Sequence, residues 1–170
     1  MVILFTGKAG AGKDTAAYIV KEFLPDSGLC AFAKKLKNIA KQSFGWDEKK
    51  DKKGRKLLQS IGQAGRAYNK DIWAEDGVRQ IKKQVQLGRV AIITDLRFRN
   101  ELDIVKKAYP KAKVILVKGR RADLGENEKD ISEHDLDGFN SFNYVLNNNG
   151  SKDELRIAVK DMLQQFGLLK

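Results

Sequence analysis

Nine residues near the amino terminus, GKAGAGKDT (Gly7–Thr15), carry the clearest chemical signal in the chain. They fit the pattern G-x-x-x-x-G-K and follow a short apolar run, Val2–Phe5, that is typical of a buried strand. Glycines in such a loop let main-chain N–H groups converge on phosphate oxygens, and the dipole of the following helix adds positive potential. We therefore predict a phosphate site in which Lys13 contacts the β and γ phosphates of a nucleotide. Its main-chain ligands are expected from Gly10, Ala11 and Gly12.

The position after Lys13 holds Asp14, where many phosphate loops have a hydroxyl that binds Mg²⁺. A carboxylate placed against phosphate oxygens without a cation would repel them. Two arrangements avoid this cost: Asp14 favours the helix N-terminus, or it reaches Mg²⁺ through a bound water. We favour the second. Thr15 preserves a hydroxyl one position later.

A second polar group follows the apolar run VAIITD, Val90–Asp95. A carboxylate at the end of a buried strand beside a phosphate loop holds magnesium or its waters in P-loop proteins, which is the role predicted for Asp95. The alternative is that Asp95 caps the loop that follows it. Arg97 and Arg99 come next, and guanidinium groups there are suited to neutralising a phosphoryl group in transfer.

Along the whole chain, short apolar runs alternate with longer amphipathic ones. The expected strands are Val2–Thr6, Leu29–Ala33, Val90–Asp95, Val114–Lys118 and Tyr144–Asn147. The expected helices cover 13–24, 34–44, 55–67, 75–87, 100–108 and 152–166. Such alternation predicts an α/β fold with a parallel sheet. Two long connections, 34–89 and 119–142, are typical of substrate-binding insertions and lids.

Composition agrees with one globular domain spanning 1–170, because 42% of the 170 residues are hydrophobic and 32% are charged. No apolar run approaches the ~20 residues that cross a bilayer, and the apolar start runs directly into the glycine loop instead of forming a signal peptide. The single cysteine, Cys30, is expected in a buried strand and suits a reducing cytosol, so we expect a cytoplasmic protein. Trp46 is expected in the core.

The net charge of +11 favours anionic partners, which leaves nucleotides, nucleic acid and acidic surfaces open. The lysines that crowd 34–56 are most simply a solvated helix face and a charged loop. A switch GTPase would need a base-reading N-K-x-D element after a later strand. The NKD at 69–71 has the wrong spacing, and the DLDG at 135–138 lies in a polar segment, so neither supports that class.

Five segments together resemble the phage-type deoxynucleoside monophosphate kinases, which belong to the P-loop nucleoside monophosphate kinase superfamily. They are GKAGAGKDT, FAKKLKNIAKQSFGW, LLQSIGQAGRAYNKDIW, ITDLRFRNE and NNGSKDEL. The resemblance implies a three-layer P-loop NTPase fold: about five parallel strands with helices on both faces, a helical acceptor-binding insertion within 34–89 and a lid-like segment at 119–142. It also implies Mg²⁺-dependent transfer of the γ-phosphoryl group of ATP to a nucleoside monophosphate.

The resemblance also implies residue roles. Arg97 falls on an arginine that reaches the phosphates, and Thr15 would lie near the α-phosphate of ATP. The acceptor would meet Arg66, Gln59 and Trp73, although Trp73 suits a packing role equally well. The remaining ATP contacts would come from Arg120, Arg121, Asn148 and Gly150. The chain departs from the family pattern at Arg99, where Pro is common, and at Asp130–Glu133, where the family has His-x-Ser-Glu.

The only histidine, His134, is expected in an exposed loop and not as a base, because an acceptor phosphate is already ionised. Two other functions remain open. One is P-loop phosphotransfer to another small phosphorylated metabolite, such as phosphomevalonate. The other is a basic, ATP-regulated nucleic-acid-binding protein, but no DNA-reading helix or aromatic sheet face is recognisable. We therefore expect ATP and a nucleoside monophosphate as partners, no stable nucleic-acid complex and no membrane. A homodimer and, if the chain is phage-encoded, a host-cytoplasm location stay open.

Overall fold

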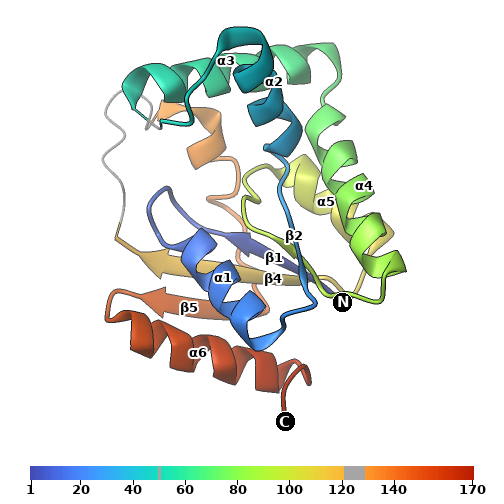
Figure 1. Ribbon diagram of the computed structural model, residues 1–170, viewed down its shortest axis with the longest axis vertical. Helices are drawn as coiled ribbons and strands as arrows, with labels where there is room; N and C mark the ends of the chain where they lie inside the picture. Colours follow the sequence, from blue (N-terminus) through green and yellow to red (C-terminus); the bar gives the residue numbers. More distant parts are fainter. Residues whose placement is uncertain (50, 121–128) are drawn as a thin grey trace.

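The computed structural model describes residues 1–49, 51–120 and 129–170 and is built on one parallel sheet (Figure 1). Its strands are β1 (Val2–Thr6), β2 (Gly28–Cys30), β3 (Ala91–Ile93), β4 (Lys113–Gly119) and β5 (Tyr144–Asn148). They lie in the order β2-β3-β1-β4-β5, and all neighbouring pairs are parallel. The predicted α/β fold with a five-stranded parallel sheet is confirmed.

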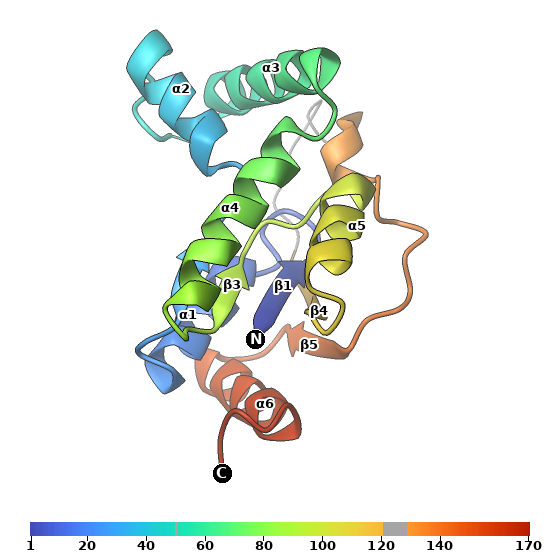
Figure 2. The same cartoon turned by 90° about the vertical axis from the view of Figure 1, so that its right-hand side faces the viewer.

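Helices cover both faces of the sheet (Figure 2). One face carries α1 (Lys13–Phe23) and α6 (Lys152–Gln165), and the other carries α4 (Ile72–Gln86) and α5 (Arg99–Ala108). The central strand β1 serves both layers because side chains alternate along a strand. Ile3 and Phe5 pack with the α1 and α6 side chains, whereas Val2 and Leu4 pack with those of α4 and α5. This fully buried strand anchors the phosphate loop that follows it.

The remaining two long helices, α2 (Lys34–Phe44) and α3 (Lys52–Tyr68), lie together away from the sheet, at the top of Figure 1. α3 begins before the expected residue 55 because the Asp51 carboxylate accepts a hydrogen bond from the Gly54 N–H at 2.7 Å and caps the helix. α4 returns to the sheet. Within the predicted insertion at 34–89, therefore, α2 and α3 are the helices that stand away from the sheet and can cover its carboxyl end.

Two strands are shorter than predicted, for one shared reason. The main-chain groups that would have continued β2 bond to side chains instead of to the sheet. Gln80 accepts from the Ala31 N–H and donates to the Ala31 carbonyl, and Asp95 accepts from the next two N–H groups, those of Phe32 and Ala33. Consequently β2 ends at Cys30, and its neighbour β3 ends at Ile93 instead of reaching Asp95.

Cys30 is buried in a strand, as predicted, and burial raises the pKa of its thiol to about 11, which makes it a poor nucleophile. The placement of Trp46 in the core is wrong. α2 ends at Phe44, and Trp46 is half-buried in the connection after it, with its indole N–H donating to the Lys49 carbonyl at 2.9 Å. None of the described helices combines the length and the apolar character needed to span a bilayer.

Candidate phosphate and acceptor site

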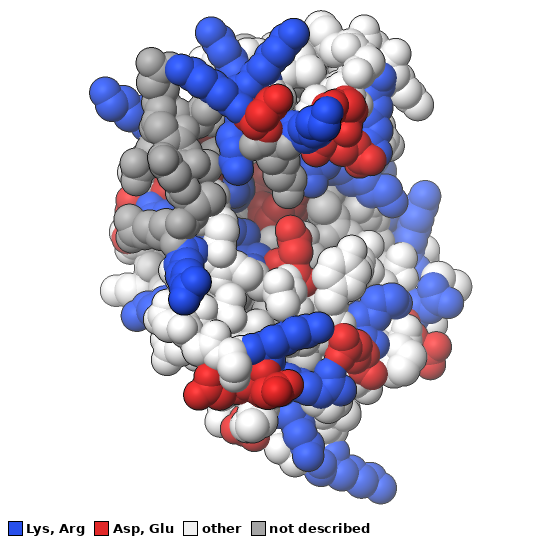
Figure 3. Space-filling view, turned by 60° about the vertical axis from the view of Figure 1, so that its left-hand side comes forward, with Lys and Arg blue, Asp and Glu red and all other residues white. Residues whose placement is uncertain are grey.

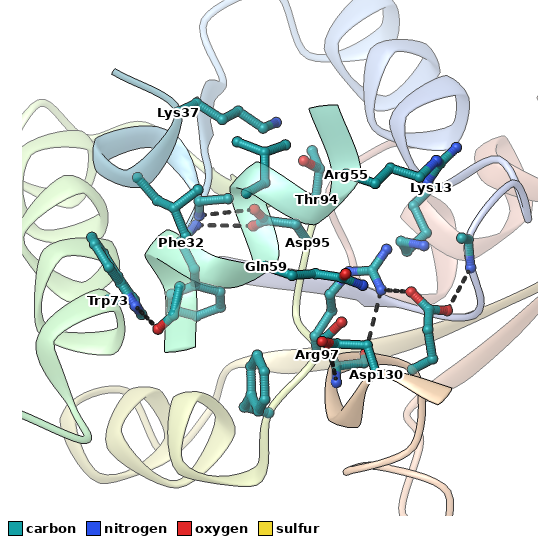
Figure 4. Close-up of a pocket in the computed structure, with 18 of the residues that line it drawn as sticks. Lys13, Phe32, Lys37, Arg55, Gln59, Trp73, Thr94, Asp95, Arg97 and Asp130 are labelled. Atoms are coloured by element: carbon teal, nitrogen blue, oxygen red, sulfur yellow. Dashed lines mark hydrogen bonds and ion pairs between the residues drawn. The ribbon is translucent and has the colours of Figure 1, made fainter. Parts of the chain in front are cut away.

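A cavity of about 470 Å³ extends from the phosphate loop to α3, at the carboxyl ends of the strands (Figure 4). The structure brings ten of the predicted site residues to its wall: Gly10, Gly12, Lys13, Asp14, Thr15, Gln59, Arg66, Trp73, Asp95 and Arg97. These residues come from the phosphate loop, α1, α3, α4 and the segment after β3. This is the edge of an open α/β sheet at which ligands bind.

The backbone of the phosphate loop has a positive φ at three glycines, Gly7, Gly10 (φ +81°) and Gly12, and at two of them a side chain would also collide with a neighbour. Gly7 has φ +141°, and a Cβ there would lie 2.3 Å from the Val117 carbonyl oxygen. Gly12 has φ +97°, and its Cβ would lie 2.1 Å from the side-chain nitrogen of Asn148. That same Asn148 amide donates a hydrogen bond to the Ala11 carbonyl at 2.9 Å. Two strands therefore constrain the loop: β4 through the Val117 carbonyl and β5 through the Asn148 side chain.

Lys13 is nearly buried and closes the loop on itself. Its Nζ donates to the main-chain carbonyls of Gly7 at 2.7 Å and Lys8 at 2.9 Å. Burial lowers the pKa of Lys13 to about 8, and the positive charge of Arg97 adds to the lowering. Three carboxylates oppose it, those of Glu133, Asp14 and Asp95. A bound anion would raise this pKa again, because a nearby negative charge favours the charged form of the lysine.

Asp95 is bound by main-chain amides. Its two carboxylate oxygens accept hydrogen bonds from the N–H groups of Phe32 at 2.9 Å and Ala33 at 3.0 Å, which are visible as dashed lines in Figure 4. Desolvation raises the pKa of this carboxyl, and the two amide bonds oppose the rise. Asp95 therefore fixes the start of α2 to the end of β3. Each oxygen keeps a lone pair for a further ligand, so the magnesium role stays a proposal.

Arg97 is positioned by a buried acid, Glu101, in the first turn of α5. One carboxylate oxygen of Glu101 accepts from the N–H groups of both Arg97 and Phe98, at 3.0 Å each. Burial raises the pKa of Glu101 to about 8, although these two bonds oppose the rise. The second arginine of the motif, Arg99, is exposed and pairs with Asp103 at 3.0 Å, so it is not part of the described cavity wall.

The lid-like segment contributes an acid that sequence reasoning did not assign to the site. Residues 121–128, and with them Arg121, lie outside the described residues. The short 3₁₀ helix η2 (Ile131–Glu133) that follows places Glu133 against the phosphate loop. The Glu133 carboxylate accepts from the Ala9 N–H at 3.2 Å and forms an ion pair with Arg97.

The opposite end of the cavity is built by side chains of α3. Arg55, Gln59 and Arg66 lie on its inner face, one or two turns apart. The Arg66 guanidinium stacks over the Phe98 ring at 4.2 Å. Burial lowers the pKa of Arg66, and neighbouring carboxylates, Asp130 first among them, oppose this. This end of the cavity is therefore lined by arginine side chains, and the guanidinium of Arg66 rests on the ring of Phe98.

Trp73 has the packing role that was one of its two predicted roles, and its ring also forms part of the cavity wall. It is 5% exposed, and its indole N–H donates to the Gly62 carbonyl at 3.0 Å. A Cβ at Gly65 would lie 2.3 Å from the ring, so the glycine at this position lets α3 approach the indole closely. Trp73 thus sets the distance between α3 and α4.

Four predicted ATP-binding residues are not among the described residues that line this cavity. Ala11 is a buried residue of the loop, and the Asn148 side chain donates a hydrogen bond to its carbonyl. Arg120 is exposed after β4, and Gly150 is exposed in the turn before α6. Their predicted contacts with ATP remain untested predictions. His134 lies outside the cavity wall as well, half exposed and bonded to Asp137 at 2.9 Å.

Sequence reasoning missed several residues of the wall, namely Phe32, Lys37, Arg55, Phe98, Glu101, Asp130 and Glu133. Phe98 and Glu101 belong to the quoted ITDLRFRNE segment, so that motif could have suggested them. Lys37 and Arg55 are indistinguishable in sequence from the other lysines and arginines of α2 and α3. Figure 3 shows Lys and Arg side chains gathered at the top of one face, where these helices lie.

The site suits a magnesium ion that is held jointly by protein carboxylates and by the phosphates of a bound substrate. No group of three or more His, Cys, Asp or Glu side chains that could hold a metal exists within the described part of the chain. Asp14 and Asp95 both line the cavity, as Lys13 does. Mg²⁺ commonly binds through one or two carboxylates together with waters and substrate phosphates, and this donor set suits that arrangement.

No family model and no curated protein matches the chain. Solved structures do match it in fold. Dephospho-CoA kinase from Campylobacter jejuni is 13% identical with a TM-score of 0.59, and 96% of each chain is covered. A sugar kinase from Janibacter sp. is 14% identical with a TM-score of 0.53, covering 98% of this chain and 94% of the other. Shikimate kinase from Aquifex aeolicus is 13% identical with a TM-score of 0.51, covering 98% and 96%. The chain therefore has the fold found in P-loop kinases.

Proposed function

We propose that the protein is an ATP-dependent phosphotransferase that converts nucleoside monophosphates, deoxynucleotides among them, to diphosphates. The observation that carries the proposal is the set of cationic side chains that line one cavity. The cavity joins a phosphate loop, with Lys13 and Arg97, to cationic side chains of α3, those of Arg55 and Arg66. The cavity therefore has cations from two separate parts of the chain, which suits the phosphates of two substrates. Simple ATP hydrolysis would not require the second set of cations.

The donor end would bind the phosphates of ATP through main-chain N–H groups of the loop and through Lys13. Arg97 would contact the phosphoryl group in transfer, and its buried partner Glu101 holds its main chain in place. The attacking group is an ionised phosphate oxygen, so the reaction needs no strong base. Positioning and charge neutralisation by these residues supply the catalysis.

The acceptor end would bind the monophosphate through Arg66, with Arg55 and Gln59 on the same helix face. Apolar and aromatic side chains, Phe32, Leu36, Leu58 and Trp73, line the wall around them. Such a surface suits the flat face of a nucleobase. When Mg²⁺ is bound it would neutralise phosphate charge, and Asp14 and Asp95 are the side chains placed to hold it or its waters.

The direct test is a screen of ATP against all common ribo- and deoxynucleoside monophosphates, following ADP release. We expect ADP only when an acceptor is added, and Lys13→Ala should abolish it. Transfer only to a non-nucleotide phosphorylated metabolite would leave a P-loop kinase with a different acceptor. Acceptor-independent hydrolysis stimulated by DNA would overturn the proposal in favour of a nucleic-acid-binding ATPase.

A further inference from the structure

One acidic side chain lies where phosphate oxygens are expected. The Glu133 side chain is 8% exposed and comes from η2, far along the sequence from the phosphate loop. Its Oε2 accepts a hydrogen bond from the Ala9 N–H at 3.2 Å, and its Oε1 pairs with Arg97. A main-chain amide of a phosphate loop and a guanidinium beside it are the two kinds of donor that bind a phosphate. A dashed line from Arg97 in Figure 4 marks its ion pair with Glu133.

The segment that carries this carboxylate is fixed to the loop. Lys8, a residue of the loop itself, donates to the main-chain carbonyl of Glu133 and to the carboxylate of Asp137. Arg97 also donates to the Ser132 carbonyl at 3.3 Å. Because Glu133 is held next to the loop, it competes for the anion site as an intramolecular group at high effective concentration.

We propose that Glu133 is a built-in phosphate mimic, which occupies part of the anion site in the nucleotide-free protein and is displaced by the phosphates of the donor. The inference rests on the proposed function, because it assumes that the loop and Arg97 bind phosphate. A carboxylate and a phosphate oxygen repel each other strongly in a partly buried site, so both cannot share these donors. Displacement frees the Ala9 N–H and the Arg97 guanidinium together.

This arrangement has a thermodynamic consequence. The apparent association constant for a polyphosphate equals the intrinsic constant multiplied by the fraction of molecules in which Glu133 is already displaced. If that fraction is about one tenth, removing the carboxylate charge tightens polyphosphate binding about 10-fold. It also links binding of the donor to release of Arg97, which would then be available for the phosphoryl group. A residue that merely positioned Arg97, or that bound the metal, would behave in the opposite way when its charge is removed.

The test uses inorganic tripolyphosphate as the probe, without magnesium or acceptor, and measures its binding to the full chain by calorimetry. Glu133→Gln keeps an oxygen that can accept from the Ala9 N–H but removes the charge that pairs with Arg97. Glu133→Ala removes the group altogether. Asp137→Asn is the matched control, because it deletes a charge from the same segment but keeps an oxygen that can accept from Lys8, and the side chain has no contact with the Ala9 N–H.

We expect both Glu133 variants to bind tripolyphosphate about 10-fold more tightly than the wild type, and Asp137→Asn to change its affinity by less than about 2-fold. Unchanged or weaker binding in Glu133→Gln and Glu133→Ala, with melting temperatures near that of the wild type, overturns the proposal. An equal gain in Asp137→Asn also overturns it, since the effect would then be a general charge effect. Tighter binding without phosphoryl transfer to any nucleotide would refute the proposed function and leave the mimic intact.

Discussion

The two ends of the cavity are built in different ways. At the donor end the anion-binding groups are main-chain amides of the loop, and side chains from elsewhere in the fold hold the backbone of this end in place. Glu101 holds the main chain at Arg97, and Asn148 braces the loop. At the acceptor end the binding groups are side chains of one helix, α3, which touches the rest of the site through Trp73 and Phe98.

This difference separates phosphate binding, which depends on the backbone, from acceptor specificity, which depends on side chains. A main-chain site needs a particular local sequence, because few residues allow the backbone to turn as Gly7 and Gly12 do. A side-chain site on an amphipathic helix can change its specificity by single substitutions without disturbing the fold. Damage to the donor end should therefore affect the rate of any transfer. Damage to the acceptor end should affect which acceptor binds, and how tightly.

The largest effect is expected for Arg97→Ala. Its guanidinium is placed to meet charge that develops during transfer, so kcat should fall about 100-fold or more, with little change in the acceptor KM. Steady-state kinetics at saturating ATP would measure this. The matched control is Arg99→Ala, which removes the neighbouring exposed arginine that pairs with Asp103 and should retain nearly full activity. Equal losses in both variants would show that net charge, not position, is important.

Glu101→Gln tests whether the donor end depends on a buried acid. The pKa of Glu101 is raised from its ordinary value of 4.5 to about 8, so between these values the folded state keeps a proton that the unfolded state releases. The free energy of unfolding should therefore fall as pH rises through this window, by about 2 kcal/mol or more. The glutamine can still accept both main-chain N–H bonds. Urea unfolding at pH 5 and pH 8 should show this pH dependence in the wild type and its loss in the variant.

Arg66→Ala is the matching change at the acceptor end. We expect the acceptor KM to rise about 10-fold with a smaller change in kcat, because Arg66 is proposed to bind a ground-state phosphate. Arg79→Ala, which removes an exposed arginine of α4 paired with Asp76, is the control and should leave KM unchanged. If Arg66→Ala lowered kcat and left KM alone, the two ends would not have separate roles.

The sequence predicted the donor end better than the acceptor end for a physical reason. GKAGAGKDT and ITDLRFRNE are local segments whose backbone geometry is dictated by their own residues, so Lys13 and Arg97 could be placed from them. Arg55 and Lys37 reach the cavity only because α2 and α3 pack near the strand ends, and this packing depends on tertiary contacts that no local sequence pattern shows. Glu133 and Ala9 are 124 residues apart in the sequence, so no local pattern could predict their contact. Strand ends at Cys30 and Ile93 were missed because side chains of Gln80 and Asp95 took the main-chain bonds.

The smallest effect is expected at Asp14, the acid that stands where a hydroxyl is usual. It is exposed in the first turn of α1 and lines the cavity beside Lys13, which agrees with either role considered for it. A negative charge at a helix N-terminus contributes about 0.3–1 kcal/mol to stability. Contact with Mg²⁺ through a water would instead show as a change in magnesium requirement, since this ion keeps several of its waters.

We propose the water-mediated role, and Asp14→Asn separates the two. The variant should lose a few-fold in activity when magnesium is limiting and recover most of it when magnesium is raised. Initial rates across a magnesium titration at fixed ATP measure this, and the control is Asp26→Asn, which removes an exposed carboxylate beyond the far end of α1. If Asp14→Asn keeps the wild-type magnesium dependence and only melts at a lower temperature, the carboxylate serves the helix end. The donor end would then bind its metal through phosphate oxygens, waters and Asp95 without help from α1.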